Sequence, residues 1–328
     1  IMKRKSIIYL LFFTIPLSIN AQNYKLVWSD EFNENSLNKN WNVEVLDKPY
    51  NNELQCYTNS SSNVNIENGN LVITARRESH NGMYFTSGRI NSSTKVNFKH
   101  GKLEARIKLP KLANGLWPAF WMMGEDPQNI GWPTCGEIDI LEAGNSNGIK
   151  NATQERLFSG CIHWGSSLAD HRMWTTGAVT SDYDITGDYH LFTAVWDDSY
   201  LRFYLDNSTQ PYYEATITKD YDSYNYFHKP FYILFNLAVG GDYTNILYPA
   251  DITALPSEGS EAKMYIDYVR LYQQEGQINV YSQETTGLGK VSTIKNKDTA
   301  YYSISGMKLN GKPSWNGLYI HGGKKIIE

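Results

Sequence analysis

The chain has 328 residues, of which 41% are hydrophobic, so it can bury a large core and form one large domain with a small addition. Its 30 Lys and Arg against 34 Asp and Glu give a formal net charge of −4, and no long run of like charge occurs. A nucleic-acid-binding protein, which needs a basic surface, is therefore not favoured. The 24 Tyr and 9 Trp suit either stacking on sugar rings or packing in a β-rich core.

The first 21 residues have the pattern of a signal peptide. Lys3, Arg4 and Lys5 form a basic start, residues 7–19 are apolar, and Ala21 closes a typical cleavage site. The apolar run is shorter than the roughly 20 residues of a membrane-spanning helix, so we expect no membrane span. Cleavage leaves 27 Lys and Arg against 34 acidic residues, and this excess favours a neutral polymer over an anionic one as partner.

Strand-like segments dominate the rest of the chain. Runs rich in β-branched or aromatic residues, separated by Asn, Gly, Asp and Pro clusters, are residues 64–77, 102–109, 190–196, 201–205, 231–239 and 264–272. Residues 102–109 alternate polar and apolar side chains, as a strand with one wet face does. Residues 197–199 and 206–207 are typical of hairpin turns. No long amphipathic helix is evident, and many short strands predict an all-β sandwich.

The chain contains three cysteines, Cys56, Cys135 and Cys161. An odd number cannot pair completely, so we expect at most one disulfide and no disulfide framework. The cysteines are far apart and lack the CxxC spacing of a zinc site, which disfavours a structural metal bound by these residues.

The most informative segment is residues 137–142, which carries three acids. Strand side chains alternate between two faces, so Glu137 and Asp139 share one face while the isoleucines point to the core. Regular alternation would bury Glu142 with the isoleucines, which is unfavourable for an unpaired carboxylate. A β-bulge near Ile140 restores the phase and brings Glu142 to the side of the other two acids.

Three acids on one face suit glycoside hydrolysis. Their crowding can separate the pKa values, so that one Glu stays ionised as nucleophile and the other stays protonated as acid. A retaining glycosidase holds such carboxyl groups about 5–5.5 Å apart. A calcium site or a solvated acidic strand could show the same short spacing, so all these interpretations stay open on spacing alone.

Residues 137–142 resemble the catalytic signature of glycoside hydrolase family 16 in its bulged, laminarinase-like form. Segments that support the resemblance follow in the family's order at residues 27–32, 52–58, 87–90, 115–122, 163–165, 236–241 and 266–270. The resemblance covers about residues 24–273 and implies a catalytic domain over residues 22–274. It also implies a concanavalin-like β-jelly-roll sandwich of two curved antiparallel sheets with an open substrate cleft.

The resemblance implies that Glu137 is the nucleophile, Asp139 its assisting carboxylate and Glu142 the acid/base. The expected activity is a retaining endo-β-glucanase that acts on β-1,3- or mixed-linkage β-1,3/1,4-glucans, as a monomer and without a cofactor for catalysis. One alternative is an agarase- or carrageenase-type galactan hydrolase of the same family, whose need for basic groups at sulfate the net negative charge does not favour. A second alternative, a non-catalytic carbohydrate-binding sandwich, has no need of the acidic triplet.

The same resemblance implies a set of sugar-binding residues. They are Asn52, Glu53, Arg89, Trp117, Trp121, Trp132, His163 and Asn236. Trp117 and Trp121 lie four apart and share a face if the segment is extended. The resemblance implies that both border the cleft as sugar platforms. His163 is expected near the acid/base and the leaving sugar. Core packing of the tryptophans and of His163, and a salt bridge or turn cap at Arg89 and Asn52, remain alternatives.

Glu31, Gly69 and Asp267 match positions that hold a structural calcium ion in many members of the family, and oxygen ligands suit calcium. We expect such an ion to fasten the ends of the sandwich without taking part in chemistry.

The last segment, residues 275–328, has the composition of a polar linker followed by a small tail. Its strand-like pieces at residues 301–304 and 318–320, set among glycine-rich turns, resemble the C-terminal sorting domains of the type IX export route of Bacteroidota-like bacteria. That resemblance implies an export machinery as partner and a secreted or cell-surface protein of a Gram-negative bacterium. A disordered or accessory tail is the alternative.

Overall fold

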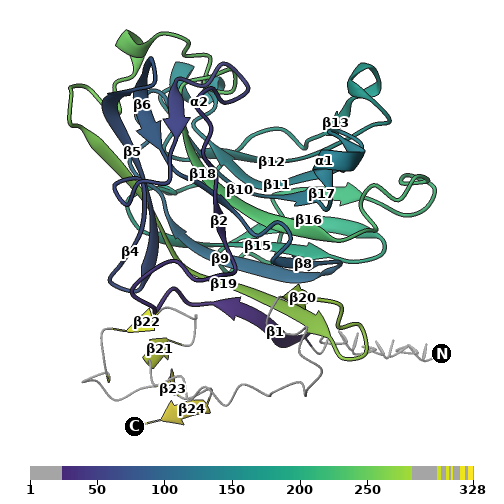
Figure 1. Cartoon of the computed structure of the whole chain (residues 1–328). Helices are drawn as coiled ribbons and strands as arrows, with labels where there is room; N and C mark the ends of the chain where they lie inside the picture. Colours follow the sequence, from purple (N-terminus) through teal and green to yellow (C-terminus); the bar gives the residue numbers. More distant parts are fainter. Residues whose placement is uncertain are drawn as a thin grey trace, which may run out of the picture.

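The structure is a computed structural model that describes residues 24–282, 301–303, 308–309, 312, 318–321 and 324–327. Two β-sheets are stacked on each other in the main part of the chain (Figure 1). The first sheet contains, in spatial order, β17 (Tyr213–Thr216), β16 (Tyr200–Leu205), β15 (Tyr189–Trp196), β9 (Gly101–Lys108), β19 (Glu261–Gln274), β5 (Asn70–His80), β6 (Met83–Ser87) and β3 (Gln55–Tyr57). In addition, β1 (Tyr24–Asp30) pairs with β19, and β4 (Val64–Glu67) pairs with β5.

The second sheet carries the acidic segment at its centre. Its order is β13 (Arg172–Trp174), β12 (Leu157–Trp164), β11 (Glu137–Ala143), β10 (Leu116–Gly124), β18 (Phe231–Val239), β7 (Arg89–Asn91) and β2 (Asn42–Val43). Three short strands join its edges: β14 (Val179–Thr180) pairs with β12, and β8 (Val96–Phe98) pairs with β18 and with β20 (Tyr281–Ser282). Within both sheets the strand pairs are antiparallel apart from β3 with β6, which confirms the predicted sandwich of antiparallel sheets.

Helices are short. In the described part of the chain they are α1 (Pro127–Ile130), α2 (Ser146–Lys150) and two 3₁₀ turns at Leu168–Asp170 and Pro249–Asp251. Among the residues that the structure describes, no helix has the length and apolarity needed to span a membrane.

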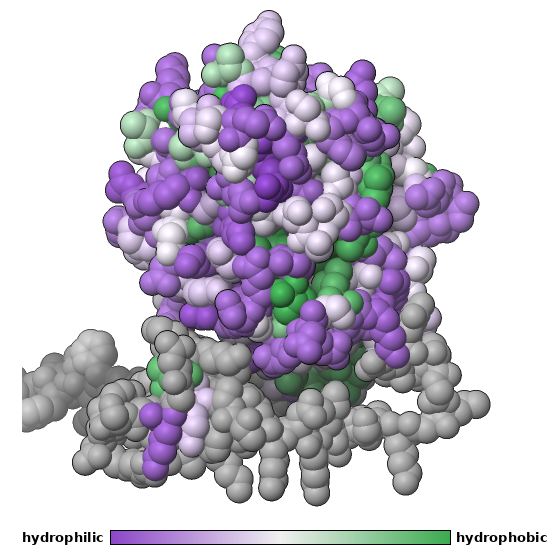
Figure 2. All heavy atoms as spheres, turned by 60° about the vertical axis from the view of Figure 1, so that its left-hand side comes forward, coloured by the Kyte–Doolittle hydropathy of each residue, from purple (hydrophilic) through white to green (hydrophobic). Residues whose placement is uncertain are grey.

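The core lies between the two sheets, and strand alternation decides which side chains enter it. In β18 the odd-numbered residues from Phe231 to Val239 join the main core, and the even-numbered residues face the opposite side of the sheet. On that opposite side, Tyr232 and Leu234 form a separate small cluster with Ala119 and Trp121 of β10. Figure 2 shows that the exterior is mostly hydrophilic on the face it presents, as one-sided burial of the sheets requires.

Most of the predicted strands are confirmed, including β9, whose buried and partly buried residues alternate along its whole length. The predicted run 64–77 is wrong in one respect, because it is two strands, β4 and β5, joined by a tight turn. Asn68 and Gly69 form this turn with φ angles of 51° and 75°, the left-handed values that Asn-Gly hairpins adopt. The turn at residues 197–199 joins β15 to β16 as predicted, whereas β16 and β17 are joined by the longer segment 206–212.

Four short strands near the C-terminus form a third, antiparallel sheet. Its order is β22 (Lys308–Leu309), β21 (Tyr301–Ser303), β23 (Leu318–His321) and β24 (Lys324–Ile327). The strand-like character predicted near residues 301 and 318 is therefore confirmed, while the role of the tail and the domain boundaries stay predictions. The predicted signal peptide, residues 1–21, lies outside the described residues.

The three cysteines are free and buried, so none of them forms a disulfide.

Candidate active site

A cleft crosses the outer face of the second sheet, above the small apolar cluster of β10 and β18. Strands β10, β11, β12 and β18 supply its floor, with Trp117, Trp121, Glu137, Asp139, Glu142, Ser159, Cys161, His163, Tyr232 and Asn236 among the lining residues. Loops complete the walls and contribute Tyr50, Trp132, Asp242 and Tyr243. The three acids of the sequence signature therefore line one groove.

A β-bulge in β11 brings the three acids to this face. The register of β11 against both of its neighbours shifts between Asp139 and Glu142. Ile140 and Leu141 are consecutive in sequence, yet both are fully buried in the main core. After this extra residue, Glu142 returns to the cleft face that already holds Glu137. The bulge predicted from the energetic cost of burying Glu142 is confirmed.

Glu137 has several partners that stabilise its negative charge. The indole Nε1 of Trp132 donates a hydrogen bond of 2.9 Å to its Oε2, and a side-chain hydrogen bond joins it to Asp139. Burial raises the pKa of Glu137 to about 7, and Trp132, the positive charge of Arg89 and Asp139 each oppose that rise.

Glu142 has fewer such partners. The indole Nε1 of Trp117 donates a hydrogen bond of 3.1 Å to its Oε1. Burial raises the pKa of Glu142 to about 7, and the charge of Glu137 raises it further, with Trp117 as the opposing influence. The two carboxyl groups titrate as a pair, and this asymmetry of partners favours the proton on Glu142 and the charge on Glu137.

Asp139 lies deeper than either glutamate, with 4% of its surface exposed. Burial, followed by the charges of Glu137 and Glu142, raises its pKa well above the usual range. A protonated Asp139 can donate its O–H to Glu137, which is the assisting role expected from the sequence. Its Oδ2 lies 3.4 Å from Nε2 of His163, but the geometry is not that of a hydrogen bond and Oδ2 has no partner among the described residues.

His163 lies beside Asp139 on the neighbouring strand β12. The register places His163 opposite Glu137 and places Ser159 opposite Glu142. His163 is therefore aligned with the nucleophile candidate, where the sequence led us to expect a position near the acid/base. Its Nδ1 lies 2.9 Å from Nε2 of His171. Burial, with a smaller effect of His171, lowers the pKa of His163 to about 4, so it is neutral at neutral pH.

The three predicted tryptophans all line the cleft, in different environments. Trp117 stacks on Tyr243 with ring centroids 5.0 Å apart and an interplanar angle of 14°. Trp121 is only 8% exposed, and the guanidinium carbon of Arg89 lies 4.8 Å from its ring centroid, so its face is covered. Trp132 is 37% exposed and can present a free face to a sugar ring.

A chain of hydrogen bonds connects the remaining predicted residues beneath the cleft. Trp121 Nε1 donates to Asn236 Oδ1 at 2.8 Å, and Asn236 Nδ2 donates to the hydroxyl of Tyr57 at 3.1 Å. That hydroxyl in turn donates to Glu53 Oε2 at 2.9 Å. Burial raises the pKa of Glu53, which the bonds from Gln55 and Tyr57 partly offset. Glu53 and Asn236 therefore fix the position of neighbouring side chains as well as lining the cleft.

Arg89 and Asn52 already have acidic partners. Arg89 Nε lies 3.0 Å from Glu44 Oε2, which holds the guanidinium in place against Trp121. Asn52 has an exposed side chain whose Nδ2 donates to Asp242 Oδ1 at 2.8 Å. Asn52 itself does not line the cleft. Its hydrogen bond connects it to Asp242, which is one of the lining residues.

Sequence analysis missed several residues of the cleft. Tyr243 is the most important, since its ring supports Trp117 and its hydroxyl donates to the backbone oxygen of Glu142 at 3.1 Å. Asp242 and Tyr243 directly follow the glycine pair at residues 240–241, so their place beside a motif segment was an available signal. Glu44 and His171 lie in segments with no recognisable pattern.

The predicted calcium ligands have other partners in this structure. Glu31 accepts two hydrogen bonds from Arg270, of 2.9 and 2.7 Å, and Asp267 Oδ2 accepts one of 2.7 Å from Arg106. A calcium ion bound to both carboxylates would lie next to two guanidinium groups, so the residues as placed do not fit the ion.

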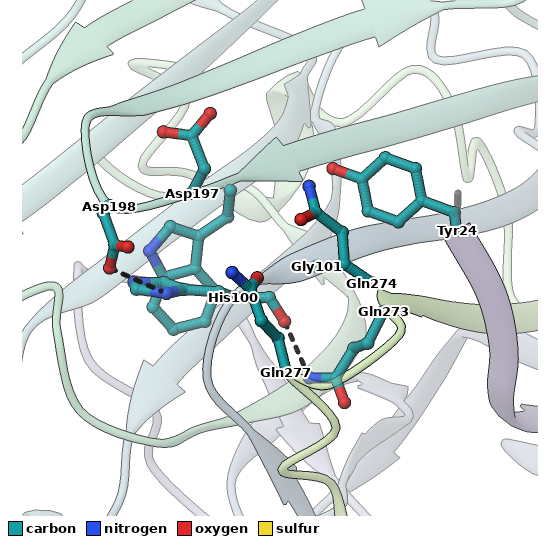
Figure 3. Close-up of a pocket in the computed structure, with 9 residues that line it drawn as sticks. Tyr24, His100, Gly101, Asp197, Asp198, Gln273, Gln274 and Gln277 are labelled. Atoms are coloured by element: carbon teal, nitrogen blue, oxygen red, sulfur yellow. Dashed lines mark hydrogen bonds and ion pairs between the residues drawn. The ribbon is translucent and has the colours of Figure 1, made fainter. Parts of the chain in front are cut away.

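A second, smaller pocket lies near the start of β9, away from the acidic strand (Figure 3). His100 Nδ1 lies 3.3 Å from Asp198 Oδ1 there, and His100 also lies 3.3 Å from a ring nitrogen of His228. The pocket has no pair of glutamates, so the chemistry expected from the sequence belongs to the large cleft.

Comparisons with known proteins agree on one family. The model of the GH16 domain of β-porphyranases A–D matches residues 24–274. A glucan endo-1,3-β-glucosidase from Cryptopygus antarcticus is 37% identical over 66% of this chain and 81% of that protein. The clotting factor G α subunit of Tachypleus tridentatus is 34% identical over 76% of this chain, which spans about a third (34%) of the subunit.

Among solved structures, a GH16 enzyme from the mixed-linkage glucan utilisation locus of Bacteroides ovatus, in complex with a G4G4G3G product, is 38% identical. It superimposes with a TM-score of 0.67 and covers 75% of this chain and 100% of its own.

Proposed function

The chain belongs to glycoside hydrolase family 16, and from this membership we propose that it is an endo-acting β-glucanase that retains anomeric configuration. Its proposed substrates are β-1,3-glucans and mixed-linkage β-1,3/1,4-glucans such as laminarin, lichenan and cereal β-glucan. The observation that carries the proposal is the bulge in β11, which brings Glu137, Asp139 and Glu142 to one face of an open cleft. The names of relatives that act on 1,3-β-glucan and mixed-linkage glucan support the choice of substrate.

In the proposed reaction, the protonated carboxyl of Glu142 gives its proton to the glycosidic oxygen as the bond from that oxygen to the anomeric carbon breaks. The carboxylate of Glu137 attacks the anomeric carbon from the opposite side and forms a glycosyl-enzyme. Glu142, now ionised, removes a proton from water, which attacks the same carbon and releases Glu137. Two inversions give net retention.

Asp139 keeps the nucleophile in place during these steps. Its raised pKa leaves it protonated, so it adds a hydrogen-bond donor next to Glu137 without adding a third negative charge. Trp132 also donates to Glu137, so the Glu137 carboxylate is held by two groups before substrate arrives.

The charge of the cleft supports a neutral substrate. Six carboxyl residues line it, namely Glu44, Glu53, Glu137, Asp139, Glu142 and Asp242, and the only Lys or Arg among its lining residues is Arg89. Because Arg89 is already paired with Glu44, the described residues of the cleft include no free guanidinium or ammonium group for a sulfate ester. This weighs against an agarase- or carrageenase-type galactan hydrolase, although the matching family model is named for β-porphyranases.

The test is a product profile on laminarin, barley β-glucan, agarose, porphyran and carrageenan. We expect new reducing ends from the two glucans, with the β-anomer as the first product by NMR, and loss of at least about 10³-fold of turnover in Glu137→Ser. Depolymerisation of a galactan in preference to both glucans would show that the substrate is wrong. Binding of glucan without any hydrolysis would support the non-catalytic sandwich instead.

Export and the sorting tail are further proposals, whereas the expected calcium ion is not proposed, because its ligands as placed do not fit it. The basic and apolar pattern of residues 1–21 supports export, and the resemblance of the tail supports the type IX route in a Gram-negative bacterium. Mass spectrometry of the mature protein from culture medium would test both, since an N-terminus at Gln22 and a missing tail are expected.

A further inference from the structure

A group of potential metal-ligand atoms lies on the floor of the cleft beside the nucleophile candidate. One ligand atom each of Asp139, Cys161 and His163 lies within 4.8 Å of the others. Neighbouring strands supply them, since Asp139 of β11 is paired in register with Cys161 of β12 and His163 lies two residues further along. All three line the cleft, so an ion can reach them from solvent.

Two of these atoms lie close together without a hydrogen bond between them. Oδ2 of Asp139 is buried and has no hydrogen-bond partner among the described residues, and Nε2 of His163 lies 3.4 Å away in a geometry that is no hydrogen bond. An unpartnered buried carboxylate oxygen is costly unless something else binds it. Two ligands of a tetrahedral zinc ion, each about 2.0–2.1 Å from the metal, lie about 3.3–3.4 Å apart, so the observed separation already fits.

His171 holds the histidine in the orientation that a metal ligand needs. Nδ1 of His163 lies 2.9 Å from Nε2 of His171, and a proton on Nδ1 donated across this distance leaves Nε2 with a free lone pair for a metal ion. The thiol of Cys161 makes only a long contact of 3.7 Å with its neighbour's carbonyl, so it is not committed to another strong partner.

We propose that Cys161, His163 and Asp139 form an inhibitory site for a divalent cation that prefers sulfur and nitrogen ligands, with zinc as the representative. The fourth position faces the cleft and takes water. Binding releases the thiol proton of Cys161 and the carboxyl proton of Asp139 to solvent. The bound ion removes the hydrogen bond from Asp139 to Glu137 and places positive charge beside the nucleophile. This inhibition rests on the proposed function, whereas the binding of the cation does not.

Cobalt(II) titration of the full chain tests the site without any activity measurement. We expect a thiolate-to-cobalt absorption band in the near ultraviolet that saturates at one ion per chain and is abolished by an excess of zinc. Cys161→Ser should lose the band, and Cys161→Ala serves if the serine variant does not fold. Cys56→Ser is the matched control, because Cys56 is also buried but bonds to the backbone oxygens of Asp47 and His80 outside the cleft, and it should keep the band.

Inhibition of glucan hydrolysis is the second readout, with each variant compared to its own rate in the absence of zinc. We expect zinc to inhibit Cys161→Ser at least about tenfold more weakly than the wild type, and loss of the orienting partner in His171→Ala to weaken zinc binding by about 10–100-fold. Absence of the cobalt band in the wild type, or its persistence in both Cys161 variants, overturns the proposal. If the band appears as expected but no glucan is cleaved, the cation site stands and the proposed function fails.

Discussion

The hydrogen bond from Trp132 to Glu137 gives the sharpest test of how the two glutamates are assigned. Trp132→Phe keeps a flat ring at the cleft wall and removes the N–H that donates at 2.9 Å to Glu137 Oε2. A hydrogen bond to a charged group contributes about 1.5–3 kcal/mol, and we use the lower end because Trp132 is 37% exposed. Since one pKa unit corresponds to about 1.4 kcal/mol, we expect the pKa of Glu137 to rise by about one unit.

The consequence should appear on one side of the pH profile. The nucleophile must be ionised, so the acidic limb of kcat/KM reports Glu137 and should move about one pH unit upward in Trp132→Phe. The basic limb, which reports the proton on Glu142, should stay nearly in place. Trp117→Phe is the matched variant, because it removes the 3.1 Å bond to Glu142 Oε1 and should move the basic limb upward.

The profiles are measured on laminarin from about pH 4 to pH 9, with binding of a non-cleavable glucan oligosaccharide as control for the altered ring. If Trp132→Phe shifts the basic limb and Trp117→Phe the acidic limb, the roles of Glu137 and Glu142 are reversed. If neither variant shifts a limb, the indoles do not control the charges of the two carboxyl groups.

Three further predictions concern stability. Glu142 has a pKa of about 7 in the folded protein, above its value in the unfolded chain, so its ionisation destabilises the fold progressively above about pH 4.5. In thermal scans, Glu142→Gln should therefore melt at a higher temperature than the wild type at pH 8. This gain in melting temperature should vanish by pH 4.5. Phe120→Ala should lower the free energy of unfolding by about 3–5 kcal/mol in urea titrations, because the fully buried ring stacks on Phe235 at 4.8 Å; a loss below about 1 kcal/mol would mean that the core collapses around the gap. A chelator such as EDTA should leave the melting temperature unchanged, because arginines already neutralise the predicted calcium ligands, and a clear decrease reversed by calcium would show that these ion pairs yield to the ion.

Much of the sheet structure could be predicted because period-two patterns and turn residues act locally. The bulge in β11 was predictable for the same reason, since burying Glu142 without a partner has a large cost. The split between β4 and β5 was missed because the residues on both sides of the turn have the same strand-like character. Asn68 and Gly69 form that turn, and this dipeptide is itself a hairpin signal.

The detailed roles of cleft residues could not be predicted because they depend on contacts between distant segments. Trp121 has the spacing of a sugar platform, but Arg89, from a strand that is remote in sequence, covers its ring. Asn52 has the position of a sugar-binding residue in a motif, but Asp242 takes its side-chain amide. Neither contact can be recognised from the residues near Trp121 or Asn52 in the sequence. The family resemblance identifies the segments that line the cleft, but it does not give the direction of each side chain.

The extra residue in β11 means that the catalytic alignment depends on the length of the backbone as well as on its side chains. Deleting Ile140 would remove the extra residue and leave Glu142 two positions after Asp139, so regular alternation would keep all three acids on the groove face without a bulge. A library of point substitutions cannot sample such a change, whereas single-residue deletions can. An in-frame deletion of that one codon therefore leaves the three acids on one face, and residual activity of the deletion variant would show that a strand one residue shorter can present them.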